Sequence, residues 1–160
     1  MTTKTENTPT IAVLETDGYE LKFYLYFSKG AARQSLNMEI EFSVLPELPQ
    51  RISIKSEKII VTTTELRRLS DYFKHHIQNL KVNANHESYT FTDYSLAYQI
   101  QALCGYASQN NEESYFSIIS MLNIGKKNSS SSSTYIGGES IIYFSQVENF
   151  IVSLENMIPL

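Results

Sequence analysis

The chain has 160 residues, of which 42% are hydrophobic and 19% are charged, as in ordinary globular domains and unlike disordered or fibrous chains. Its 13 lysines and arginines are outnumbered by 17 aspartates and glutamates, which gives a net charge of −4. Nucleic-acid binders need a basic excess to neutralise phosphates, and the longest basic clusters here are only Arg67–Arg68 and Lys126–Lys127, so this composition argues against nucleic-acid binding.

Cys104 is the single cysteine, so no disulfide can form within the chain, and this favours a reducing compartment. The first ten residues lack the apolar stretch of a secretory signal. No run approaches the roughly 18 apolar residues of a membrane span. The sequence therefore predicts a cytoplasmic protein without a membrane partner.

Residues 1–8 are polar and lack periodicity, so we expect a disordered N-terminus before a single domain over residues 9–160. Within that domain, apolar or aromatic residues occupy every second position over Tyr19–Phe27 and again over Leu36–Val44. Such alternation buries one face of an antiparallel sheet and leaves the other face in water. The residues around Gly30 separate the two runs, which predicts a hairpin.

Ile52–Ile54 and Lys58–Val61 predict one further strand or a bent one. The apolar period then becomes that of a helix. The helical stripe consists of Leu66, Leu69, Phe73, Ile77 and Leu80. Thr62 and Glu65 have the spacing of a capping box, in which each side chain accepts a hydrogen bond from the backbone N–H of the other residue. This combination predicts the most clearly defined helix of the chain.

After this helix, Tyr89–Thr92 predicts a short strand. Ser95–Ala107 is compatible with two structures, because its apolar residues fit both one face of a strand and one face of a helix. We favour the strand. Tyr115–Ile124 and Glu139–Phe144 predict two more strands.

A second helix closes the chain, and Ser145 and Glu148 have the spacing of a capping box at its start. Its apolar face consists of Val147, Phe150, Ile151, Leu154 and Ile158. Groups of consecutive strands alternate with single helices, which favours antiparallel pairing. We therefore predict an α+β fold of two layers, in which a mainly antiparallel sheet of about six to eight strands is covered by a central and a C-terminal helix.

Residues 125–140, GKKNSSSSSTYIGGES, raise the question of a phosphate-binding loop. A P-loop needs an earlier glycine and a helix after its lysine, and a dinucleotide fingerprint needs a third glycine; the segment lacks all of these. Five consecutive serines offer no apolar surface to pack, so we predict a flexible loop over residues 125–138 at the tip of a hairpin. A functional loop that becomes ordered on ligand binding is the alternative.

No residue pattern predicts catalysis, a metal site or a cofactor site. His75 and His76 are neighbours on a helix and project about 100° apart, so they cannot share a metal as an i, i+4 pair does. We expect His75 in solvent, His76 at the edge of the packed face and His86 in a polar loop. Cys104 lies in an apolar run, which predicts a buried, structural thiol. The G-x-S-x-G nucleophile motif does not occur.

The tyrosines are the most informative polar residues, since the chain has 11 of them and no tryptophan. Tyr24 and Tyr26 fall on the strand face opposite Leu21, Phe23 and Leu25, so the second half of this strand is apolar on both sides. Exposed tyrosine rings are enriched at protein interfaces, which makes Tyr24 and Tyr26 a candidate interaction face. The alternative is that the sheet curls and the rings cover one another across strands.

The chain resembles a known family in the order of three segments, which are TTTELRRLSDYFKHHI, YTFTDYSLAYQIQAL and FSQVENFIVSLENMI. Their order resembles small bacterial immunity-like proteins of the WapI type, in which strands lead to a helix, then to more strands and a closing helix. The resemblance covers most of residues 9–158 and consists of the order of elements. It implies a non-enzymatic protein that binds another protein, with no catalytic residues to transfer.

Two classes of function follow from these observations. The first is a non-catalytic protein-binding or regulatory module, whose partner is another protein or a second copy of the chain. The second is a small-molecule-binding protein or enzyme with a pocket between sheet and helices, because apolar pockets leave no short sequence motif.

Overall fold

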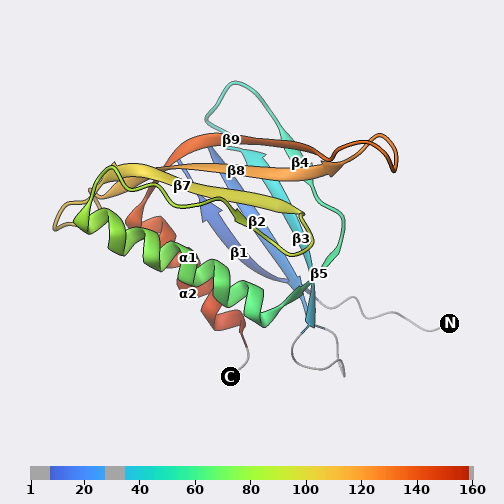
Figure 1. Cartoon of the computed structure of the whole chain (residues 1–160), viewed down its shortest axis with the longest axis horizontal. Helices are drawn as coiled ribbons and strands as arrows, with labels where there is room; N and C mark the ends of the chain where they lie inside the picture. The colour runs from blue at the N-terminus through green and yellow to red at the C-terminus, as the bar shows by residue number, and fades with distance from the viewer. Residues whose placement is uncertain (1–7, 28–34, 159–160) are drawn as a thin grey trace.

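Figure 1 shows the computed structural model, which describes residues 8–27 and 35–158. Within these residues the chain forms nine strands and two helices. The N-terminus expected to be disordered and the hairpin loop expected at Gly30 lie outside the described residues, apart from Thr8. The α+β fold class is confirmed, but the strands form two antiparallel sheets instead of one.

The first sheet, sheet A, contains β1 (Thr10–Glu15), β2 (Tyr19–Tyr26), β3 (Ser35–Val44), β4 (Ser53–Lys55) and β5 (Ile59–Thr62). β1, β2 and β3 are neighbours in that order, and β4 and β5 both pair with β3. The alternation predicted for β2 and β3 is confirmed, because every second residue is buried. The sequence analysis did not predict β1, since Ile11 and Val13 are apolar like the buried Ala12 and Leu14 and hide the period of two.

The second sheet, sheet B, consists of β6 (Phe91–Thr92), β7 (Tyr98–Tyr106), β8 (Tyr115–Gly125) and β9 (Thr134–Tyr143), in that order. β7 confirms the strand over Ser95–Ala107 and excludes the helix. β9 starts five residues before the predicted strand at Glu139, so the loop predicted over residues 125–138 is shorter, and the tip of the hairpin is 126–133 (Figure 1). Gly137 lies within β9, where only glycine fits, because a Cβ there would lie 1.8 Å from the Ser120 carbonyl oxygen.

Helix α1 (Thr63–Val82) begins as predicted. The Glu65 N–H donates to Thr62 Oγ1 at 3.2 Å, and the Thr62 N–H donates to Glu65 Oε2 at 2.9 Å. Helix α2 (Phe144–Met157) begins differently, because its N-cap is Tyr143, whose N–H donates to Gln146 Oε1 at 2.9 Å. The predicted cap residue Ser145 lies inside the helix.

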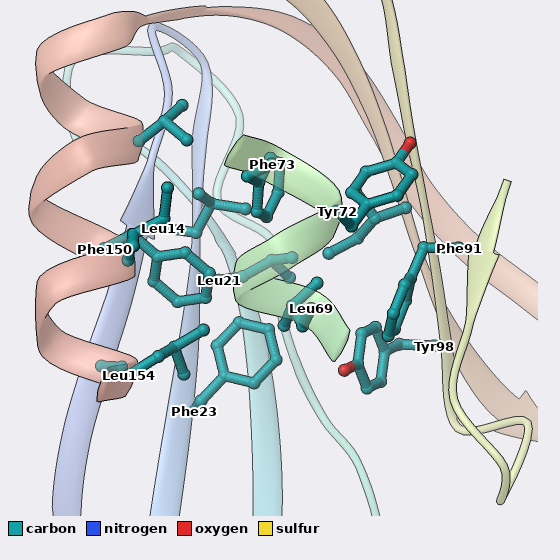
Figure 2. Close-up of a cluster of buried hydrophobic side chains, with 14 of the residues drawn as sticks. Leu14, Leu21, Phe23, Leu69, Tyr72, Phe73, Phe91, Tyr98, Phe150 and Leu154 are labelled. Atoms are coloured by element: carbon teal, nitrogen blue, oxygen red, sulfur yellow. The ribbon is translucent and has the colours of Figure 1, made fainter. Parts of the chain in front are cut away.

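The two sheets and the two helices share one hydrophobic core. α2 lies against β1 and α1, and α1 also approaches β5 and β7, so the helices lie side by side against the sheets (Figure 1). Figure 2 shows the centre of this core, where Phe23 of β2 packs between Tyr98 of β7 and Phe150 of α2 at ring-centroid distances of 5.5 and 5.3 Å. Neither described helix has the length and hydrophobicity that crossing a membrane requires.

The prediction of a buried Cys104 is wrong, because its side chain is exposed. The buried alternation of β7 runs through Tyr98, Ile100 and Ala102, and the register with β8 then shifts between Ala102 and Gly105. A bulge of this kind inserts an extra residue into one strand and ends the strict alternation of its side chains. Sequence periodicity cannot show where such a bulge occurs.

Candidate binding cleft between the two sheets

A cleft of about 300 Å³ opens between the two sheets at one end of the molecule. Sheet A contributes the connection between β4 and β5, from Ile54 to Ile59. Sheet B contributes Ser95 and Ala97 from the turn between β6 and β7, and residues 123–125 from the end of β8. The lining is partly apolar and partly polar, as in sites that bind an apolar group and orient it with hydrogen bonds.

The turn between β6 and β7 is held by the buried carboxylate of Asp93. Asp93 Oδ2 accepts from the Ser95 N–H and Oδ1 accepts from the Tyr98 N–H, both at 3.0 Å. Burial raises the pKa of Asp93, although these backbone N–H groups act in the opposite direction. A side chain that bridges backbone groups on both sides of a turn restricts the turn to one conformation.

Two side chains of α1 also bind the same turn, through hydrogen bonds and contacts with aromatic rings. Glu65 Oε1 accepts from the Tyr94 N–H at 3.0 Å, in addition to the capping role of this carboxylate. The Arg68 guanidinium lies 4.4 Å from the ring centroids of both Phe91 and Tyr94, and its Nη2 donates to the Thr92 carbonyl at 2.7 Å. The turn is therefore preorganised by α1 as well as by its own residues.

Leu96 lies at the centre of this turn in an unusual conformation. Its φ of 56° is in the left-handed region, and no other described residue apart from glycine has a positive φ. Its carbonyl accepts from Asn123 Nδ2 at 2.9 Å and from the Tyr135 hydroxyl at 3.2 Å. Its side chain is 54% exposed. A left-handed leucine costs about 1–3 kcal/mol, and surrounding contacts must maintain it, so such outliers are often found at functional sites.

The rim of the cleft is positively charged. The two segments that border it, 55–58 and 125–127, contain four lysines and one glutamate, in a chain whose net charge is −4. Lys55 and Lys58 share one counter-ion, Glu39, at 3.1 and 3.7 Å, and their ammonium groups lie over rings on the outer face of sheet A, so the rim charge comes from the other two lysines. Lys126 and Lys127 directly follow the lining residue Gly125 and are exposed. A negatively charged ligand group would therefore be attracted to this rim.

Tyr24 and Tyr26 lie outside the cleft, on the outer face of sheet A. Both rings are half-buried, with Lys55 Nζ 4.6 Å from the Tyr24 ring centroid and Lys58 Nζ 4.7 Å from the Tyr26 ring centroid. The Tyr24 hydroxyl donates to Glu41 Oε2 at 2.7 Å, and this bond raises the pKa of Tyr24 to about 12. The two rings are thus part of a network of lysines and glutamates, and they do not form an uncovered apolar patch.

The carboxylates of the same network carry depressed pKa values. The hydrogen bond from Tyr24 holds the pKa of Glu41 below its usual range, with further bonds from Ser53 and Ser43. Burial alone would raise the pKa of Glu39, but the bonds and charges of Lys55 and its neighbours lower it.

Of the three histidines, only His76 differs in its position from the prediction, which placed it at the edge of the packed face. His75 is exposed as expected, whereas His76 is fully buried against the Phe116 ring, with a centroid distance of 4.5 Å. His86 approaches to a ring-centroid distance of 5.4 Å from His76, and Ser88 Oγ lies 2.9 Å from His76 Nδ1. Burial, followed by the charge of His86, lowers the pKa of His76 to about 4. Within residues 8–27 and 35–158, no three His, Cys, Asp or Glu side chains lie close enough to hold a metal ion.

The sequence analysis did not identify the residues of the cleft. Leu96 is an ordinary leucine in a run that alternates as a strand, and nothing local marks its positive φ. The run Asp93-Tyr-Ser is a weak signal, since aspartate and serine initiate turns through side-chain bonds to the backbone. The lining residues are brought together only by the pairing of β4 and β5 with β3 and by the packing of sheet A against sheet B.

No protein-family model matches the chain, and no curated protein matches it.

Proposed function

We propose that this protein is a non-catalytic module that binds another protein through the cleft between its two sheets. The observation that carries the proposal is Leu96, which lies between the lining residues Ser95 and Ala97, because an exposed apolar side chain on a strained, firmly held backbone beside a concave site is typical of binding surfaces. An immunity-like role in a bacterial cytoplasm, which the WapI-type resemblance implies, would be one instance of such a module.

The cleft suits a partner segment that combines an apolar side chain with acidic neighbours. An aliphatic or aromatic side chain fits the partly apolar lining beside Ile54 and Ile124, and the partner would bury Leu96 at the same time. Acidic neighbours would then lie against Lys126 and Lys127, which would also accelerate association.

The test compares two carboxylate substitutions at residues of equal exposure. Leu96 is 54% exposed at the cleft, and Val152 is 55% exposed on α2. We expect Leu96→Asp to weaken binding of a partner captured by the native chain by about tenfold or more, and Val152→Asp to leave it unchanged. The measurement is a titration with the purified partner at two salt concentrations, where the native chain should lose affinity in high salt.

Equal binding by Leu96→Asp and the native chain would contradict the cleft as the site. A second comparison addresses the tyrosine face proposed from the sequence. If Tyr24→Ser/Tyr26→Ser abolishes capture while Leu96→Asp does not, the partner binds the outer face of sheet A instead.

Small-molecule binding is the second candidate, and the observation that favours it is the size of the cleft. A volume of about 300 Å³ is at the lower end of ligand pockets. A ligand that raises the melting temperature of the native chain by several degrees, but not that of Leu96→Asp, would support this function. Such a result without any protein partner would displace the protein-binding proposal.

A further inference from the structure

The free edge of β9 has a defined set of outward-facing backbone groups. The Ile141 carbonyl accepts from the Asp17 N–H at 2.9 Å, and the Tyr143 N–H donates to Gln146 Oε1, so both point away from β8. Asn123 of β8 is paired with Tyr135 of β9. The Asn123 N–H donates to the Ala97 carbonyl, so it points away from β9. Because the hydrogen-bonding direction alternates from residue to residue along a regular strand, the backbone N–H and C=O groups of the odd-numbered residues of β9 point away from β8.

One end of this edge is already covered by the chain itself. Asp17 and Gln146 occupy the outward groups of Ile141 and Tyr143. The other end contains Tyr135, Gly137 and Glu139, and among residues 8–27 and 35–158 no group bonds to the outward side of their backbone. This free segment contains no proline or lysine, which are the residues that usually protect an exposed edge.

We infer that a second copy of this chain pairs with the free segment, β9 against β9 in antiparallel orientation, with Gly137 on the two-fold axis. In this register Tyr135 lies opposite Glu139 of the partner subunit, and the two Gly137 residues lie opposite each other. All three odd-numbered residues exchange N–H···O=C bonds across the interface. The two copies of sheet B become one continuous sheet, and the interface is isologous.

The register is self-complementary in its side chains. Tyr135 and Glu139 lie on the same sheet face, so the pairing places a tyrosine beside a carboxylate and keeps the two Glu139 side chains apart. The exposed Ile136 falls opposite Gly138 of the partner subunit, so a large side chain meets the smallest residue. The glycine at the axis allows the two backbones to approach closely.

The register also fits the length of the free segment. The next outward residue, Ile141, would face residue 133 of the partner subunit, which precedes its β9. Asp17 covers Ile141 at that same position. Pairing therefore ends where the partner's strand begins and where the chain covers its own edge, so the outward groups of Tyr135, Gly137 and Glu139 are all paired within the dimer.

The experiment measures the monomer–dimer equilibrium of the full chain by sedimentation velocity over a wide range of concentration. We expect the native chain to dimerise. Tyr135→Glu should raise the dissociation constant by about tenfold or more, because it places two carboxylates opposite each other twice per dimer. Tyr135→Glu/Glu139→Lys should restore dimerisation, because each new carboxylate then faces an ammonium group.

Tyr115→Glu is the matched control, because Tyr115 lies on the same face of sheet B but on an interior strand. It should leave the dimer intact. Hydrogen exchange at the N–H groups of Gly137 and Glu139 should slow as concentration rises, while that of the Tyr143 N–H, already bonded to Gln146, should not change. A native chain that stays monomeric, or a double variant without rescue, would overturn the inference. Dissociation by Tyr115→Glu alone would place the contact on the sheet face instead.

Discussion

The space between the two sheets is filled in one region and open in another. In the filled region, Phe23 of sheet A meets Tyr98 of sheet B at 5.5 Å, and the Tyr19 hydroxyl donates to Ser120 Oγ at 2.8 Å. In the open region, Ile54 and Ile124 face a cleft of about 300 Å³. Apolar side chains occur in both regions, so the presence of an apolar residue does not by itself distinguish the core from the candidate site.

The length of the strands accounts for the difference. β2 and β3 have eight and ten residues and face sheet B along the filled region, where interdigitated side chains exclude water. β4 and β5 have three and four residues, and the connection between them borders the cleft. The cleft therefore forms where the regular strands of sheet A end before those of sheet B.

The largest expected effect is the loss of a ring from the filled region. Phe23→Ala should lower the free energy of unfolding by about 3–5 kcal/mol, because Phe23 is fully buried between sheet B and α2. Ile124→Ala in the cleft should lower it by less than about 1 kcal/mol, since this side chain is already 46% exposed. Urea midpoints measure both. Equal losses would show that the cleft is packed in solution and is not a site.

The next effect concerns a buried titratable group where α1 packs on sheet B. His76 has a folded pKa of about 4, below the ordinary value of 6.5, so the folded protein excludes its proton. The resulting stability is fully present above pH 6.5 and decreases as the pH falls towards 4. At about 1.4 kcal/mol per unit, the loss approaches about 3 kcal/mol.

Denaturant unfolding at several pH values tests this prediction. His76→Gln should remove most of the decrease between pH 6.5 and 4, while His75→Gln should preserve it, because His75 is exposed. An unchanged pH dependence in His76→Gln would assign the acid sensitivity to other groups.

A smaller effect compares two tyrosine hydroxyls, one in each region. Tyr19→Phe should cost about 1–2 kcal/mol, because it leaves the buried Ser120 hydroxyl without its partner. Tyr135→Phe removes an exposed bond to the Leu96 carbonyl and should cost a few tenths of a kcal/mol, on the order of 0.3. If Tyr135→Phe were the more destabilising of the two, the bond at the cleft would be a major stabilising contact.

The smallest effect has the opposite sign. Leu96→Gly should raise the free energy of unfolding by up to about 1 kcal/mol, because glycine adopts a φ of 56° without the steric cost that leucine carries. The same variant should bind the partner more weakly than the native chain. Destabilisation by this substitution would show that the Leu96 side chain contributes to packing, and the argument from strain would then fail.

The local pattern of the sequence was sufficient for most elements. The alternation over Leu36–Val44 and the Thr62–Glu65 capping box are confirmed, because both depend on residues within a few positions of each other. The failures are also local in origin. At Cys104 a bulge shifts the register, and β1 has apolar residues on both of its faces.

The candidate site could not be predicted in this way. Leu96 takes its conformation from Asp93, Asn123 and Tyr135, the last two of which lie 27 and 39 positions further along the chain. His76 of α1 is buried because Phe116 of sheet B packs on its ring. No periodicity of either segment contains this information.

The sequence by itself determined which segments form strands, which form helices and which face of each is apolar, since backbone geometry alone sets the periods of strands and helices. Only the tertiary structure decided that the strands divide into two sheets, and that a cleft and a free edge remain beside a shared core. The physical reason is the range of the deciding contacts. The Tyr19–Ser120 bond that joins the sheets spans 101 positions, and a contact of that range depends on the packing of the whole chain.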